Sequence, residues 1–106
     1  IGARRTIVEE NAWLPVALLK AFEQSKQLAL DRLSDTSATK ITLPFVEEQL
    51  RSARELMGED FWPYGVEPNR HVLDAFLKSH HSQGLSPRQL AVDELFHSST
   101  LEVFRI

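Results

Sequence analysis

The sequence contains no cysteine, and this absence excludes several classes of site at once. Zinc sites built from thiolates, iron–sulfur clusters, disulfide bonds and cysteine nucleophiles all require a residue that the 106-residue chain does not have. Any catalytic or metal site must therefore be built from histidine, carboxylate, hydroxyl or cationic side chains.

Long apolar runs and clusters of like charge are also missing. The longest apolar run, residues 12–19, contains a proline and is far shorter than the roughly 20 residues that cross a bilayer. The net charge is −3, and the Lys and Arg residues form no basic stripe. We therefore expect a soluble chain with neither a membrane nor a nucleic acid as its partner. With 42% hydrophobic and 25% charged residues, the composition is that of a globular protein.

Residues 1–10 show none of the features of a signal peptide, and the first residue is Ile1 rather than methionine. We take the chain to be cut from a longer protein. Its length allows one small core, and it contains no internal repeat.

Apolar residues recur at helical spacing through most of the chain, which predicts an all-α segment. Helices are expected over residues 6–10, 12–33 and 44–57, and from Pro68 to a stop at Gly84. A further short helix is expected to begin at residues 86–87, and another turn or two at 92–96. Thr6 and Glu9 have the spacing of a capping box, and Asn11 is the expected N-cap of the long helix. Pro44 and Pro68 are expected in first turns, where the missing N–H is not needed.

The remaining segments are expected to be loops. Residues 34–42 are polar, and residues 59–67 form an aromatic loop that should be packed against the rest of the chain. We interpret Phe61 and Trp62 as packing residues. The tail, residues 98–106, is expected to dock as an extended strip.

Residues 57–70 read Met-Gly-Glu-Asp-Phe-Trp-Pro-Tyr-Gly-Val-Glu-Pro-Asn-Arg, which is not a pattern that helix formation alone produces. This run resembles the C-terminal signature of the 4,5-dihydroxyphthalate decarboxylase family. Four further stretches agree with that region of the family: residues 11–22, 77–90, 93–96 and 99–102.

The resemblance implies that residues 1–106 are a single C-terminal helical segment of a lyase that removes CO2 from an aromatic dicarboxylate in phthalate degradation. It also implies that these helices belong to a two-lobed α/β fold like that of type II periplasmic binding proteins, with the strands upstream. A non-catalytic solute-binding protein of an ABC-type transporter with the same fold is the alternative. A cytoplasmic location fits the enzyme.

Decarboxylation needs a general acid for the ring carbon and cationic or N–H groups for the carboxylates. No organic cofactor is required, because the phenol delocalises charge, and a divalent metal stays open as an alternative. We expect a small aromatic carboxylate as the ligand of the whole protein. The isolated chain is expected to be inactive, because half of the cleft is missing, and to self-associate through apolar surface that the missing part would cover.

His71 and His80 are the candidate catalytic residues, and Tyr64, Asn69 and Arg70 are the candidate substrate-binding residues. No residue is assigned to a metal. These side chains also have structural interpretations, since His80 falls on an apolar stripe typical of a packed residue and Tyr64 can cover the core.

Helical spacing leaves two further alternatives open. Arg70 can bind a substrate carboxylate or pair with Glu67 or Asp74. Glu67, His71 and Asp74 share one helix face, which suits either a metal or acid–base site or an ordinary solvated surface. The neighbouring His80 and His81 point about 100° apart and cannot chelate one ion.

Overall fold

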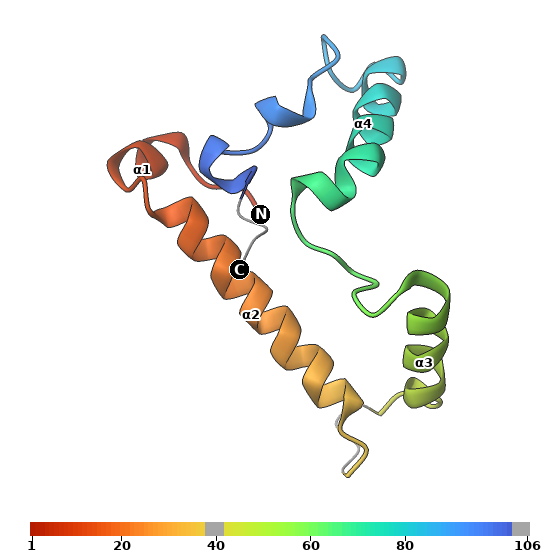
Figure 1. Ribbon diagram of the computed structural model, residues 1–106. Coiled ribbons are helices and arrows are strands. Elements are labelled where there is room, and N and C mark those ends of the chain that lie inside the picture. Colours follow the sequence, from red (N-terminus) through yellow and green to blue (C-terminus); the bar gives the residue numbers. More distant parts are fainter. Residues whose placement is uncertain (38–41, 103–106) are drawn as a thin grey trace. The chain divides into compact units, whose positions relative to one another are not determined.

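A computed structural model describes residues 1–37 and 42–102, and within these residues all regular structure is helical. The elements are α1 (Arg5–Glu10), α2 (Leu14–Ser34), α3 (Val46–Met57), α4 (Val66–Ser82) and two 3-10 turns, η1 (Val92–Glu94) and η2 (Ser98–Thr100) (Figure 1). The prediction of an all-α segment is confirmed. None of the helices that can be described is long and apolar enough to cross a membrane.

The chain divides into two compact units. One unit comprises residues 1–19 together with residues from 64 onward, and the other comprises residues 20–63. We refer to them as the α4 unit and the α3 unit. That residues 1–106 act as one segment stays a prediction.

The junction between α1 and α2 differs from the prediction. The N-cap of α1 is Arg4, with no side-chain cap, so the capping box of Thr6 and Glu9 does not form. The Asn11 side chain instead donates from Nδ2 to the Ile7 carbonyl oxygen at 3.1 Å, at the end of α1. Asn11 therefore completes the first helix, and α2 begins at Leu14, two residues later than an Asn11 cap would place it.

Helix α3 begins at Val46, two residues later than predicted, because Phe45 adopts a left-handed conformation with φ 62° that interrupts the helix and leaves Pro44 outside. Glu47 and Glu48 lie in the first turn, where carboxylates favour the positive end of the helix dipole. Gly58, at φ 93°, ends the helix as predicted.

Helix α4 begins two residues earlier than predicted. Gly65 is its N-cap, so Pro68 lies in the first turn, where a missing N–H costs little. At the other end, Gly84 has φ 75°, and its N–H donates to the His81 carbonyl oxygen at 2.9 Å. The N–H of Leu85 donates to the His80 carbonyl oxygen at 3.1 Å. Gly84 is thus the predicted stop, two residues beyond the last helical residue.

The α4 unit holds all the buried side chains of the described residues. They are Val66 and Leu77 on α4 and Val92 on η1, with Leu73, Leu90 and Leu101 packed around them. This small core joins α4 to the chain that follows it. In the α3 unit, apolar side chains such as those of Leu33 and Leu50 are only half-buried.

Three expectations about loops and the tail are wrong. Trp62 is 67% exposed, so it is not a packing residue, although Phe61 is half-buried. Residues 86–87 lie in a turn rather than a short helix. At residues 98–100 the backbone forms η2 instead of an extended strip, because the N–H of Ser99 donates to His97 Nδ1 at 3.3 Å and caps the turn. Residues 103–106 of the expected strip lie outside the described residues.

Candidate functional site

The five candidate residues lie on α4 and immediately before it. Tyr64 is half-buried just before the N-cap, and the other four residues are on the helix. At about 100° and 1.5 Å per residue, a separation of nine positions in the sequence places His71 and His80 on opposite sides of the helix, about 13.5 Å apart along its axis. The structure does not bring the two candidate acids to one site.

Arg70 is held by two carboxylates. Its Nη2 donates to Glu67 Oε1 at 2.7 Å and to Asp93 Oδ1 at 2.9 Å, and its Nε donates to Glu67 Oε1 at 3.1 Å. The hydrogen bonds from Glu67, and then from Asp93, raise the pKa of Arg70 above its usual range. The interpretation that Arg70 pairs with Glu67 is confirmed, and Asp93 on η1 is the second partner.

This arrangement changes what Arg70 can do for a ligand. The guanidinium links α4 to η1 beside the core, and its charge is already compensated by the two carboxylates. A substrate carboxylate that binds Arg70 through two parallel hydrogen bonds would have to displace Glu67 or Asp93, which are both exposed. A binding role for Arg70 stays a prediction.

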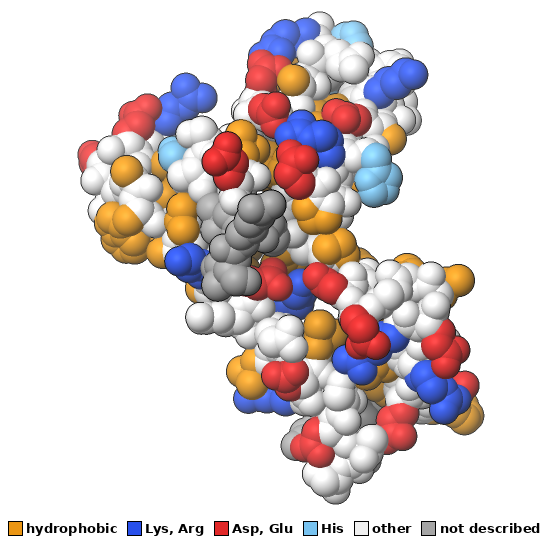
Figure 2. All heavy atoms as spheres, in the orientation of Figure 1, with side chains coloured by type: hydrophobic (Ala, Val, Ile, Leu, Met, Phe, Trp, Pro, Cys, Tyr) orange, Lys and Arg blue, Asp and Glu red, His pale blue; other side chains and the backbone are white. Residues whose placement is uncertain are grey.

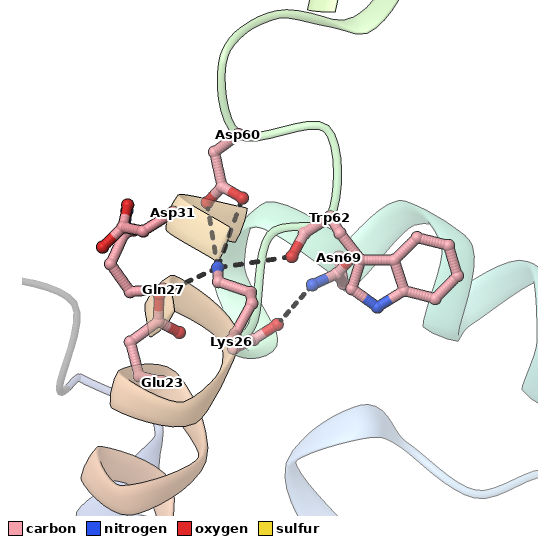
Figure 3. Close-up of polar contacts among 8 residues, drawn as sticks. Glu23, Lys26, Gln27, Asp31, Asp60, Trp62 and Asn69 are labelled. Atoms are coloured by element: carbon pink, nitrogen blue, oxygen red, sulfur yellow. Dashed lines mark hydrogen bonds and ion pairs between the residues drawn. The ribbon is translucent and has the colours of Figure 1, made fainter. Parts of the chain in front are cut away.

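Asn69 contributes to the first turn of α4. Its Nδ2 donates to the Gly65 carbonyl oxygen at 2.8 Å, and the side chain is partly buried (Figure 3). One of its two amide hydrogens is thereby committed to the backbone. Substrate binding by Asn69 or Tyr64 stays a prediction.

His80 is packed against an aromatic ring. The centroids of the His80 and Phe76 rings are 5.6 Å apart, with the planes tilted by 41°, and the imidazole is half-buried. The structural interpretation of His80 as a packed residue therefore holds, and a half-buried imidazole can still exchange protons with a ligand. Its catalytic role stays a prediction.

His71 lies on the exposed, charged side of α4, together with Glu67 and Asp74. Among residues 1–37 and 42–102, no three His, Asp or Glu side chains are close enough to hold a metal ion. The structure therefore does not assemble Glu67, His71 and Asp74 as a ligand set. Glu67, His71 and Asp74 instead form a solvent-exposed face of α4, which is the structural interpretation that the sequence also allows.

His81 has a role that sequence reasoning missed. Its Nδ1 lies 3.2 Å from the Ser86 carbonyl oxygen, and since a carbonyl only accepts, Nδ1 carries the proton. The imidazole thus closes the turn that follows α4. A glycine stop followed by Ser-Pro was the available signal for such a turn.

A second ion pair was also missed. Arg88 Nη1 and Nη2 donate to Glu94 Oε2 and Oε1 at 3.0 and 2.6 Å, and the Ala91 N–H donates to Glu94 Oε2 at 2.7 Å. The hydrogen bond from Arg88, and then that from Ala91, lowers the pKa of Glu94 to about 2. This ion pair links Arg88, in the segment before η1, to Glu94 at the end of η1.

In the α3 unit, Lys26 connects α2 to the aromatic loop (Figure 3). Its Nζ lies 2.8 Å from Glu23 Oε1, 3.2 Å from Asp60 Oδ1 and 3.3 Å from the Trp62 carbonyl oxygen, and its side chain is only 8% exposed. Desolvation lowers the pKa of Lys26, but the hydrogen bonds to Glu23 and Asp60 outweigh it, and the pKa is raised overall. Asp60 is 34 residues away, so no helical spacing could have indicated this contact.

A pocket of about 340 Å³ lies between the C-terminal half of α2 and α3. It is lined by Leu33, Ser34, Thr36, Glu47, Leu50, Arg51, Arg54, Glu55 and Glu59. Arg54 donates from Nη2 to Ser34 Oγ at 3.1 Å, and its Nε lies 3.4 Å from Glu59 Oε2. The lining contains none of the five candidate residues, and its arginines face carboxylates, so it does not resemble the expected substrate site.

No protein-family model matches this chain. A curated protein, the 4,5-dihydroxyphthalate decarboxylase of Comamonas testosteroni, is 60% identical over 106 residues, which are 100% of this chain and 32% of that protein. The chain thus spans about a third of the length of this relative. The resemblance inferred from residues 57–70 is confirmed.

Proposed function

We propose that this chain is the C-terminal part of a 4,5-dihydroxyphthalate decarboxylase, a lyase that removes CO2 from an aromatic dicarboxylate in aromatic-compound degradation. The observation that supports this proposal is the 60% identity to the Comamonas testosteroni protein over every residue of the chain. Because the chain spans only 32% of that relative, the activity is proposed for the longer parent protein.

The proposed reaction breaks the bond between the ring and one carboxylate. A general acid delivers a proton to that ring carbon, and as carbon dioxide leaves, the electron pair of the broken bond returns to the π system of the ring. A ring hydroxyl delocalises the developing charge, so no organic cofactor is needed, and a divalent metal is the alternative. In this proposal His80 is the acid, because its imidazole is half-buried beside Phe76, whereas that of His71 faces solvent.

Tyr64, Asn69 and Arg70 would orient the substrate. Arg70 suits a carboxylate by geometry, since its planar guanidinium can donate two parallel hydrogen bonds once Glu67 or Asp93 is displaced. The two-lobed fold and the cytoplasmic location belong to the same proposal. A cleft between two lobes requires residues from both, so the isolated chain is expected to show no turnover.

The direct test is to incubate the full-length protein with 4,5-dihydroxyphthalate and measure CO2 release. Phthalate, which lacks the ring hydroxyls, is the matched control and should not react. Binding of 4,5-dihydroxyphthalate without turnover would instead support a solute-binding protein of an ABC-type transporter. Turnover by the 106-residue chain alone would show that the chain holds a complete site.

Two matched variants separate the candidate acids. Loss of a general acid lowers kcat by about 10²–10⁴-fold, so His80→Asn is expected to show such a loss and His71→Asn only a change of several fold. The reverse result would assign the acid to His71. Equal small losses in both would place the acid outside this chain.

We also propose that the chain self-associates when isolated. Trp13 is 65% exposed and Trp62 is 67% exposed, and hydrophobic side chains reach the surface over several elements (Figure 2). Light scattering over a concentration series is expected to show a mass that rises above the monomer. A monomer mass that persists at high concentration would contradict this proposal.

A further inference from the structure

Helix α4 carries apolar side chains on two of its sides. One set, Val66, Leu73 and Leu77, packs into the core of the α4 unit. A second set begins with Val72 and Phe76, which are 56% and 58% exposed, and ends at His80. We call Val72, Phe76 and His80 the outer stripe. At about 100° per residue it runs along α4 beside the core-facing side rather than opposite it.

The remaining side of α4 is charged. Glu67, His71, Asp74 and Lys78 are all exposed there. A surface helix needs one apolar stripe for its core and a polar side for solvent, and α4 has both of these without the outer stripe. The exposed Val72 and Phe76 therefore indicate a second covering partner.

We propose that the outer stripe is the face on which the rest of the parent polypeptide packs. This inference shares with the proposed function the premise that the parent is as long as its relative, of which this chain spans 32%. A polypeptide of that length supplies about twice as much chain again, joined covalently and thus present at high effective concentration. A second copy of the chain or a separate protein does not have this advantage.

The position of His80 follows from this packing. His80 lies at the end of the outer stripe, against Phe76, so its imidazole is at the boundary between this chain and the rest of the parent. Ligand sites form preferentially at such boundaries, because two walls are needed to enclose a small molecule. His71 faces away from the boundary, on the charged side. With this packing, His80 would lie beside a ligand at the boundary and His71 would not.

Thiol labelling of the full-length protein tests the packing without any need for activity. This chain has no cysteine of its own, so once the cysteines elsewhere in the parent are replaced, Val72→Cys and Lys78→Cys each introduce one reporter on α4. In the native protein, maleimide should label Val72→Cys at least about 10-fold more slowly than Lys78→Cys, because a covered thiol reacts only on opening. In denaturant the two rates should be equal.

Equal native rates would show that the outer stripe is open to solvent and would overturn the proposal. Protection of Val72→Cys that disappears on dilution would identify a second copy as the partner, which also overturns it. If Val72→Cys fails to fold, hydroxyl-radical footprinting of the unsubstituted protein gives the same answer, because Phe76 should be oxidised far more slowly in the native than in the denatured state. If the outer stripe is protected but the full-length protein has no decarboxylase activity, the proposed function is rejected and the proposed packing is retained. If the outer stripe is open to solvent in an active decarboxylase, the packing is rejected and the function is retained.

Discussion

The two units of the chain are stabilised in different ways. The α4 unit has a core in which Val66 and Val92 are each 2% exposed and Leu77 is 5% exposed. In the α3 unit no described residue is fully buried, and the contacts between α2 and later segments include polar ones, such as those of Lys26 with Asp60 and of Arg54 with Ser34. One unit thus relies on apolar burial and the other on half-buried apolar side chains and ion pairs.

This difference indicates which unit depends more on the rest of the parent protein. Burial of apolar area is the main favourable term in folding, and exposed ion pairs contribute little on their own. The α4 unit is stabilised by a buried apolar core of its own. The α3 unit exposes large apolar side chains, including Leu56 and Phe45, and gains less from its own contacts. We expect substitutions in the core of the α4 unit to have the larger effects on stability.

The largest effect is expected from Leu77→Ala. Removing a buried leucine side chain leaves a cavity and lowers the free energy of unfolding by about 2–4 kcal/mol. Leu50→Ala, at a half-buried position of α3, should cost about half as much, because less area is buried there. Hydrogen exchange of the α4 and α3 amides, measured separately, checks both values.

Leu56→Ala is the control for this pair, since Leu56 is 84% exposed and the substitution should change stability by less than about 0.5 kcal/mol. If Leu77→Ala and Leu50→Ala cost the same, the contrast between the two units is wrong.

The fold was predictable from the sequence because its helices are strongly periodic. All four α-helices were predicted, and the main errors lie at the starts of α2, α3 and α4. Pro44 and Asn11 were assigned to helix starts on side-chain preference, but the left-handed backbone of Phe45 and the contact of Asn11 with Ile7 decide otherwise. Such errors arise because a cap depends on backbone conformation, and more than one residue nearby can supply it.

The site was only partly predictable. The pairing of Arg70 with Glu67 follows from a spacing of three residues along a helix, and it was anticipated. The contact of Arg70 with Asp93 joins residues 23 apart in the sequence, and it depends on how η1 packs on α4. Periodicity within one element cannot reveal contacts of this kind. The exposure of Trp62 was missed for the same reason, because residue type suggests burial but packing decides it.

An intermediate effect is expected from Lys26→Met, which keeps most of the aliphatic stem and removes the charge. Asp60 and the Trp62 carbonyl oxygen lose their common partner, so residues 59–62 should become more mobile. The free energy of unfolding should fall by about 1 kcal/mol. This is less than the cost of losing a buried hydrogen bond to a charged group, because Asp60 is more than half exposed. Fluorescence anisotropy of Trp62 in a Trp13→Phe background should fall.

Lys20→Met is the matched control, because Lys20 is an exposed lysine on the same helix. It should leave the anisotropy of Trp62 unchanged. A similar fall in both variants would mean that Lys26 does not anchor the aromatic loop.

The smallest effect is expected from the exposed pair of Arg88 and Glu94, and it should depend on pH. The pKa of Glu94 is lowered from 4.5 to about 2 in the folded chain. A carboxyl with a depressed pKa stabilises the folded state above its unfolded pKa, and this contribution is lost as the pH falls through the folded value. A double-mutant cycle with Arg88→Gln and Glu94→Gln should therefore give a favourable coupling at pH 6 that declines below about pH 4.5 and vanishes near pH 2.

The coupling should also weaken in high salt, because both side chains are exposed. A coupling that stays constant from pH 6 to pH 2 would show that the two side chains are not ion-paired in solution, and that the turn before η1 is held by the Ala91 N–H and the apolar core alone.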